Sequence, residues 1–84
     1  MFLAIVSNLP KDYDFYLSNH SRLQDVLKVF PVKESGLEFI IFRHYEDADD
    51  LKYNFDQMEI WCERKQDFCQ LKIKCFSLCF RSEE

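Results

Sequence analysis

Short apolar runs alternate with polar segments along the chain, and their periodicity predicts where the first strands form. Residues 2–6 form a run of β-forming residues that ends at an Asn-Leu-Pro turn sequence. Residues 28–32 alternate weakly between apolar and polar side chains, and the KESG sequence at 33–36 is typical of a four-residue hairpin loop. Residues 37–43 are rich in Phe and Ile. The pattern therefore predicts a strand near the N-terminus and a later hairpin of two strands.

Helical spacing separates the first strand from this hairpin. Positions three or four residues apart form a stripe that comprises Tyr13, Tyr16, Leu17, His20, Leu23 and Leu27. Asp12 and Asp14 suit the positive N-terminal end of a helix that begins there. Ser21 and Gln24 resemble a capping box and would begin a separate helix. The spacing predicts one helix or two short ones, with His20 partly buried.

A second helix is predicted in the sequence YEDADDLKYNFDQM, at residues 45–58. Asp47 is suited to cap its N-terminus, because a carboxylate there accepts hydrogen bonds from free backbone N–H groups. Its buried stripe is spaced three or four residues apart and comprises Ala48, Leu51, Phe55 and Met58. Residues 59–68 are ambiguous between a helix end and a small hairpin.

Alternating side chains return at the end of the chain, from Cys69 to Cys79. One face of this predicted strand carries Cys69, Leu71, Ile73 and Cys75, and the other carries Gln70, Lys72 and Lys74. The predicted order is strand, helix, strand, strand, helix, strand. This order predicts an α+β fold of the ferredoxin-like type, a four-stranded antiparallel sheet with two helices on one face. Residues 1–84 are expected to form a single domain.

Alternation within residues 37–43 places side chains on opposite faces of the predicted sheet. If Gly36 ends the turn, Ile40 and Phe42 point towards the helices. An apolar strip is then left on the open face, and it comprises Ile5, Leu37, Phe39 and Ile41. Exposed strips of this kind mark an interface or lie beneath another part of the chain. The segment available to cover it is the C-terminal run of Phe76, Leu78 and Phe80.

Four segments resemble the RNA-recognition-motif (RRM) family, in the right order along the whole chain. AIVSNLP at 4–10 is similar to the hexamer signature on the first strand of that family. SGLEFIIF at 35–42 is similar to the octamer on its third strand. YEDADDL at 45–51 resembles the acidic start of its second helix, and QLKIKC at 70–75 resembles its last strand.

The resemblance implies a sheet whose open face stacks single-stranded RNA bases on aromatic side chains. The family's stacking positions correspond to Ile5, Leu37 and Phe39, of which only Phe39 is aromatic. Ser35 stands where the octamer begins with a basic residue, and Glu38 stands where the family keeps a small inward one. These departures predict weak RNA binding, because each stacked base contributes about 1–3 kcal/mol.

Roles for individual residues follow from this resemblance and from the strand alternation. Phe39 is expected to stack on a base, while Ile5, Leu37 and Ile41 supply apolar contact. Phosphate contacts are expected from Lys72, Lys74 and Arg43. The expected partner is single-stranded RNA, bound weakly, or a protein of an RNA-processing assembly.

Composition and charge limit the alternatives. The 84 residues carry a net charge of −4 and a pI of about 5.1, which argues against indiscriminate binding to nucleic acid. The longest apolar run is too short for a membrane span, and the N-terminal run is too short for a signal peptide. The protein is therefore expected inside the cell, in the nucleus or the cytoplasm.

No cofactor, metal or catalytic residue is predicted. Cys62, Cys69, Cys75 and Cys79 contain no C-x-x-C pair and are expected to be buried reduced thiols. The acidic residues at 46–50 lack the glycine and terminal Glu of a calcium loop and are typical of a helix N-terminus. His44 is expected in a surface loop. Trp61 and Phe68 could form a peptide- or base-contacting pair at the rim of the sheet or cap the bottom of the core, and the core is the favoured place because large aromatic side chains are usually mostly buried.

The sequence predicts a non-catalytic binding module that acts in RNA metabolism through the open sheet face. A module that binds only proteins, through this face or through the acidic start of the second helix, is the alternative. A third possibility is a small acidic inhibitor that occupies a nucleic-acid-binding groove of another protein by charge complementarity.

Overall fold

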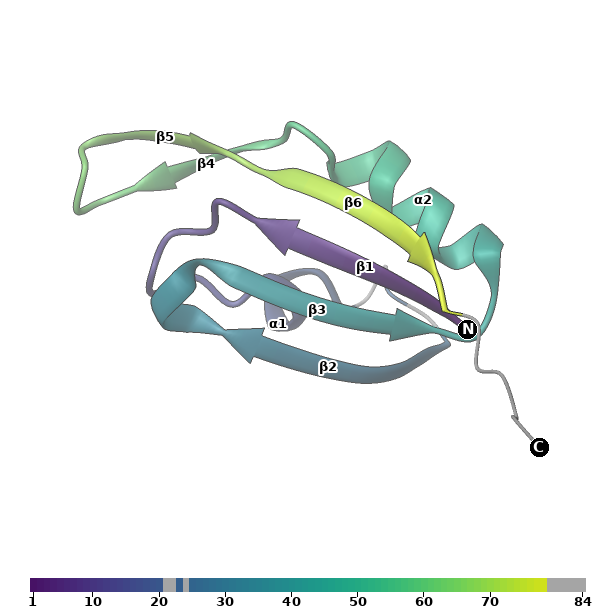
Figure 1. Ribbon diagram of the computed structural model, residues 1–84. Coiled ribbons are helices and arrows are strands. Elements are labelled where there is room, and N and C mark those ends of the chain that lie inside the picture. Colours follow the sequence, from purple (N-terminus) through teal and green to yellow (C-terminus); the bar gives the residue numbers. More distant parts are fainter. Residues whose placement is uncertain (21–22, 24, 79–84) are drawn as a thin grey trace.

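A computed structural model describes residues 1–20, 23 and 25–78 (Figure 1). The elements in chain order are β1 (Phe2–Ser7), α1 (Phe15–Asn19), β2 (Val26–Val32), the short 3₁₀ helix η2 (Lys33–Ser35), β3 (Leu37–Phe42), α2 (Tyr45–Phe55), β4 (Glu59–Cys62), β5 (Asp67–Gln70) and β6 (Lys72–Ser77).

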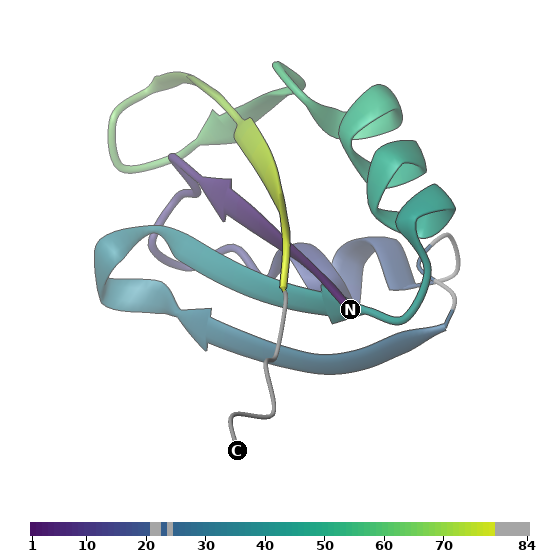
Figure 2. The ribbon, with the colours of Figure 1, turned by 45° about the vertical axis from the view of Figure 1, so that its right-hand side comes forward.

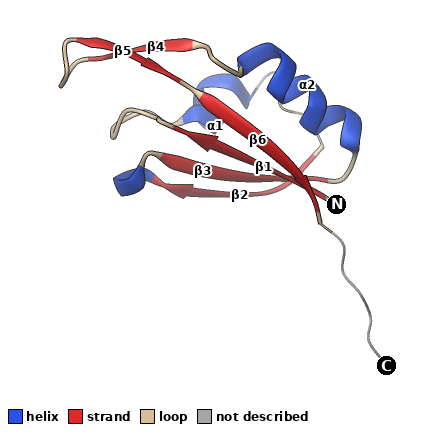
Figure 3. Cartoon of the chain, turned by 45° about the horizontal axis from the view of Figure 1, so that its top comes forward, coloured by secondary structure: helices blue, strands red, loops and turns tan. Residues whose placement is uncertain are grey.

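Four strands form one antiparallel sheet in the spatial order β2-β3-β1-β6. Both helices lie on the same side of this sheet (Figure 3). The predicted ferredoxin-like arrangement, with two helices on one face and the other face open, is therefore confirmed. The strands β4 and β5 form a separate two-stranded hairpin that projects beyond one end of the sheet (Figure 1).

The hydrophobic core lies between the sheet and the two helices. Its strand residues alternate with open-face residues, and β3 is buried at every second position. Phe15 of α1 meets Phe55 of α2 edge to face, with ring centroids 5.3 Å apart. The buried core comprises Ala4, Val6, Leu9, Phe15, Leu23, Ile40, Phe42, Ala48, Leu51, Phe55, Leu71 and Ile73. The stripe predicted for the second helix is confirmed at its three helical positions, and Met58 packs against the core just beyond them.

The prediction for the first helix is wrong in extent and only partly right in its stripe, since Leu23 lies in the core and Tyr13 and Tyr16 pack against it. The helix α1 spans only Phe15–Asn19, and its buried residue is Phe15, which was not on the predicted stripe. Leu17 is 69% exposed, and His20 is exposed as well. Leu27 lies in β2, because the segment that begins at Val26 pairs with β3 and packs its side chains against those of the neighbouring strand. The alternative start at Ser21 and Gln24 lies outside the described residues.

Two boundaries near α2 and β6 also differ from the prediction. The helix α2 begins at Tyr45, two residues before Asp47, and its N-cap is His44, which makes no side-chain capping bond. Asp47 therefore lies in the first turn, where its charge still complements the helix dipole. The predicted strand from Cys69 to Cys79 is broken at Leu71, whose backbone bonds Gln57 and Met58 instead of a neighbouring strand.

The ambiguous segment at 59–68 forms most of the β4–β5 hairpin. Trp61 and Phe68 pair across it edge to face, with ring centroids 5.2 Å apart, and they are 45% and 56% exposed. Their predicted place in the core is therefore wrong. The opposite face of the hairpin carries Cys62 and Cys69, which are buried free thiols as predicted, whereas Cys75 in β6 is half-buried. Cys79 lies outside the described residues.

Gly36 joins the β2–β3 loop to the loop that follows β1. Its φ of 66° lies in the left-handed region, and its carbonyl accepts a 3.0 Å hydrogen bond from the Leu9 N–H. A Cβ at this position would lie 2.7 Å from the Leu9 carbonyl oxygen. Glycine is therefore required here both by the backbone conformation and by the close approach of the two loops.

Replacing Gly36 with alanine is expected to lower the free energy of unfolding by about 2 kcal/mol or more, since the left-handed conformation alone costs alanine about 1–2 kcal/mol. Urea unfolding measures this loss. The neighbouring exposed variant Ser35→Ala is the control and should stay within about 0.5 kcal/mol of the parent. Equal stability of the two variants would contradict the strain assigned to Gly36.

Candidate nucleic-acid interface

The open face is the side of the four-stranded sheet that lies away from α1 and α2. Strand register arranges its side chains in rows that run across β2, β3, β1 and β6. The central row comprises Phe30, Phe39, Ile5 and Lys74. A second row comprises Lys28, Ile41, Leu3 and Phe76. At the loop end of the sheet, Val32 pairs with Leu37 and Ser7 pairs with Lys72.

The structure brings the predicted apolar strip together on this face. Ile5 and Phe39 are direct partners on β1 and β3, and Leu37 and Ile41 lie two residues to either side of Phe39. All four are half-buried. The predicted direction of β3 is confirmed, because Ile40 and Phe42 are buried under the helices at 0% and 1% exposure.

The predicted phosphate-binding residues are exposed but separated. Lys74 ends the central row and Lys72 lies next to Ser7, whose hydroxyl donates a 3.2 Å hydrogen bond to the Lys72 carbonyl. Arg43 follows the last residue of β3, at the opposite end of the sheet from Lys72. The face therefore has two cations along its β6 edge, while Arg43 lies at the end away from them.

Two aromatic residues on this face were missed by sequence reasoning. Phe30 in β2 pairs directly with Phe39 and is 46% exposed, and Phe76 in β6 pairs with Leu3 and is equally exposed. The Lys28 ammonium lies 5.6 Å from the centre of the Phe30 ring. The weak alternation of β2 was the available signal for Phe30. None of the segments that resemble the RRM family includes β2. That Phe30 lies beside Phe39 follows only from the pairing of β2 with β3 in the folded sheet.

The C-terminal run does not cover the strip within the described residues. Phe76 belongs to β6 and adds to the open face beside Leu3. The Leu78 N–H donates a 2.8 Å hydrogen bond to the Met1 carbonyl, which continues the edge of the sheet and does not cross its face. Phe80 lies outside the described residues. The interpretation that this run covers the strip is therefore wrong for Phe76.

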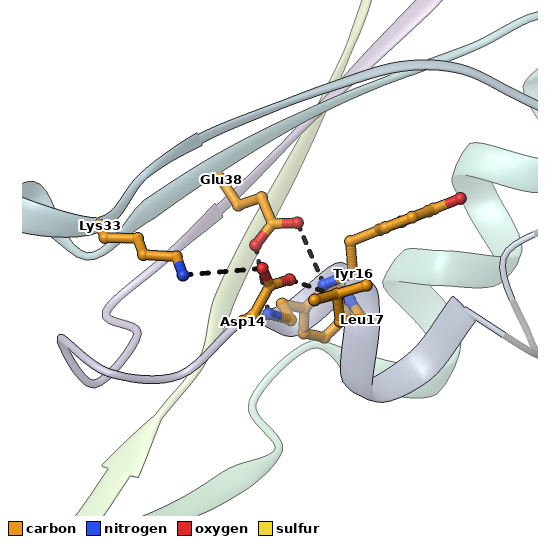
Figure 4. A network of polar contacts seen from close by, with 6 residues as sticks. Asp14, Tyr16, Leu17, Lys33 and Glu38 are labelled. Carbon is orange, nitrogen blue, oxygen red and sulfur yellow. Dashed lines mark hydrogen bonds and ion pairs between the residues drawn. The ribbon is translucent and has the colours of Figure 1, made fainter.

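A buried carboxylate on the helix side fixes α1 beneath the sheet (Figure 4). Glu38 is 1% exposed and accepts hydrogen bonds from the backbone N–H groups of Phe15, at 3.2 Å, and Tyr16, at 3.0 Å. Asp14 accepts a third from the Leu17 N–H at 2.9 Å and lies 3.8 Å from the Lys33 ammonium. Three free N–H groups at the start of this short helix are therefore satisfied by carboxylates.

The electrostatics of Glu38 reflect two opposing influences. Burial, and then the nearby Asp14 carboxylate, raise the pKa of Glu38 above its ordinary value. The N–H groups of Tyr16 and Phe15 and the Lys33 ammonium oppose this rise. Glu38 thus acts as a structural anchor for α1, at a position where the resemblance implies a small side chain.

Among the described residues, no group of three or more His, Cys, Asp or Glu side chains is arranged to hold a metal ion. Burial, followed by the proximity of Cys62, raises the pKa of the Cys69 thiol, which keeps it protonated and a poor nucleophile. None of the described helices has the length and apolar character needed to cross a membrane.

The protein is similar to known proteins in structure but not in sequence. No model of a known protein family matches the chain, and no curated protein is similar to it in sequence. The RRM domain of S. pombe Puf1 is similar in fold, with a TM-score of 0.73 at 11% identity, over 98% of this chain and 96% of that one. A second crystal form of it gives a TM-score of 0.69 at 10% identity, over 93% and 97%.

A third solved structure agrees. The second RRM domain of the yeast poly(U)-binding protein Pub1 has a TM-score of 0.61 at 13% identity, over 96% of this chain and 100% of that one. The chain therefore has the ferredoxin-like fold of RRM domains over nearly all of its length. Identities this low establish the fold alone.

Proposed function

We propose that residues 1–84 act as a single non-catalytic module that binds single-stranded RNA through the open face. The observation that carries the proposal is the central row of this face, in which Phe30 and Phe39 lie side by side on adjacent strands. Stacking on aromatic side chains is the main way in which a sheet of this type takes RNA bases. Two adjacent rings offer platforms for two successive bases.

The cations beside these rings suit a strand of RNA that crosses the sheet. Lys28 lies near the Phe30 ring, and Lys74 ends the same row as Phe39. Lys72 follows one row further along β6. Phosphates of an RNA whose bases stack on Phe30 and Phe39 would meet these ammonium groups on either side of the apolar strip.

Weak affinity is expected, because the aromatic set is small and the protein is acidic. The net charge of −4 repels polyanions at long range, so that affinity depends on local contacts. We place this module in RNA metabolism, inside the cell, in the nucleus or the cytoplasm. The finer choice of RNA sequence depends on contacts to base edges.

A protein partner on the same face is the second candidate, and the row containing Leu3, Ile41 and Phe76 favours it. This row is apolar from β3 to β6 and ends at an exposed aromatic ring. Apolar sheet faces of this kind bury well against another protein. Such a partner would belong to an assembly that handles RNA, and it would compete with RNA for the face.

The proposal is tested by titrating the protein into a labelled pool of mixed single-stranded RNA at two salt concentrations. We expect binding at low salt that weakens as salt rises. The slope of log affinity against log salt should be about −2, because phosphate contacts from Lys28, Lys72 and Lys74 would each contribute about −0.7. Fluorescence anisotropy measures both values. A wild-type protein that binds no RNA at low salt would contradict the RNA proposal and leave the protein-partner candidate.

A further inference from the structure

A hollow of about 290 Å³ lies at the loop end of the sheet and belongs to no part of the open face described above. Three segments far apart in sequence form it: the loop after β1, the β2–β3 loop and the β4–β5 hairpin. All three lie on the same side of the molecule (Figure 2). Its lining comprises Asn8, Leu9, Pro10, Lys11, Lys33, Glu34, Ser35, Gly36, Cys62, Arg64, Lys65 and Cys69.

The charges of this basic hollow are unbalanced. Of the described residues that line it, four are cationic, Lys11, Lys33, Arg64 and Lys65, and one, Glu34, is acidic. Of these cations, only Lys33 has an ion pair with another described residue, the 3.8 Å contact with Asp14. All four side chains are exposed, and an anion bound between them would lower their mutual repulsion. The lining therefore favours an anionic occupant.

Hydrogen bonds hold the walls of the basic hollow in place. The Leu9 N–H bonds the Gly36 carbonyl and so joins the first two loops. The Asn8 side-chain amide donates a 2.7 Å hydrogen bond to the Gln70 carbonyl, which joins the first loop to the hairpin. The hairpin turn is closed by Gln66, whose side chain donates a 2.7 Å bond to the Glu63 carbonyl. The cations are thus carried on backbone that is already positioned for a ligand.

The basic hollow also adjoins the open face. Ser7 and Val32 are the last residues of β1 and β2, and Asn8 and Lys33, which follow them directly, line the hollow. Leu37, which begins β3, likewise follows Gly36 in the lining. An RNA strand that extends from the central row towards this end of the sheet would therefore reach the hollow next.

We infer that the basic hollow binds a backbone phosphate of the RNA strand that extends from the open face past the loop end of the sheet. This inference rests on the proposed function, since it concerns the same RNA. It assigns the phosphate contacts to Arg64 and Lys65 from the hairpin and to Lys11 and Lys33 from the two loops. The aromatic side chains of the open face still bind the bases. The hollow lengthens the stretch of RNA that is bound and adds affinity that depends on salt.

The test compares two labelled single-stranded RNA pools, about 4 and about 12 nucleotides long, which lie within the range of sites seen for single-strand-binding modules. The wild-type protein should bind the longer pool more tightly and with the steeper salt dependence. Arg64→Ala and Lys65→Ala should each weaken binding of the longer pool about threefold and reduce its salt slope by about 0.7. Neither should change binding of the shorter pool.

Lys52→Ala is the matched control, because it removes the same charge from the exposed surface of α2. It should leave both pools unaffected apart from a small uniform change. If Arg64→Ala and Lys65→Ala bind the longer pool as tightly as Lys52→Ala does, the inference is overturned while the proposed function stands. A wild-type protein that binds neither pool contradicts the proposed function itself.

Amide chemical shifts separate an RNA phosphate from a free one. The longer RNA should shift the amide signals of Lys11, Lys33 and Lys65, and inorganic phosphate at the same concentration should shift them little. Saturation of these shifts by inorganic phosphate at a lower concentration than by RNA would identify a site for free phosphate. That outcome would also overturn the inference.

Discussion

Replacing Phe39 with alanine is expected to weaken binding of single-stranded RNA by about 5- to 150-fold, the equivalent of the roughly 1–3 kcal/mol that one base–aromatic stack contributes. Phe30→Ala is expected to cause a loss of the same order, because Phe30 is the direct partner of Phe39 on the neighbouring strand. Fluorescence anisotropy at low salt measures both losses. The double variant should fall to the limit of detection.

Tyr53→Ala provides the matched control, since it removes an aromatic ring that is 82% exposed on α2, in the layer opposite the open face. Its RNA affinity should equal that of the parent. If Tyr53→Ala weakens binding as much as Phe39→Ala does, the open face is not the RNA-binding surface. Unchanged affinity of both Phe30→Ala and Phe39→Ala would lead to the same conclusion.

Replacing Glu38 with alanine is expected to lower the free energy of unfolding by about 2–4 kcal/mol, because two backbone N–H groups at the start of α1 lose their acceptor in a buried place. This is a large share of the roughly 5–15 kcal/mol by which a small domain is stable. Urea unfolding measures the loss. Glu34→Ala, an exposed carboxylate in the adjacent loop, should change stability by less than about 0.5 kcal/mol.

The contribution of Glu38 to the free energy of unfolding changes with pH in a definite direction. Since burial raises the pKa of Glu38 in the folded protein, its contribution to stability is fully present below the ordinary pKa of a glutamate. It is lost as the pH rises through the raised pKa. The stability margin of the parent over Glu38→Gln should therefore be larger at about pH 4 than at about pH 7. A margin that grows towards neutral pH would contradict the assigned direction.

The order of elements and the direction of β3 were predictable because each follows from local periodicity. Alternation in the 37–43 segment identified Ile40 and Phe42 as core residues and left Phe39 outward, and the structure confirms both. The buried stripe of α2 was also predictable, because Ala48, Leu51 and Phe55 are spaced three or four residues apart and so lie on one face of the helix. In these segments the local preference and the tertiary environment favour the same structure.

The first helix and the hairpin were not predictable in this way. Helical spacing continued from Tyr13 to Leu27, yet residues from Val26 onwards are taken by a strand whose partner lies beyond the loop. Trp61 was expected in the core because large aromatics are mostly buried, but the projecting hairpin leaves its ring beside Phe68 and partly in solvent. Both errors arise from contacts between segments distant in sequence, which periodicity cannot represent.

The sequence by itself determined the α+β class, the strand and helix order, and which side chains of β3 look away from the helices. Only the tertiary structure decided that Phe30 stands beside Phe39, that Glu38 holds the start of α1, and that four cations from three loops surround one hollow. The physical reason is that alternation and helical spacing are properties of a single segment. Which side chains become neighbours on a sheet or around a cavity depends instead on how segments distant in sequence pair and pack.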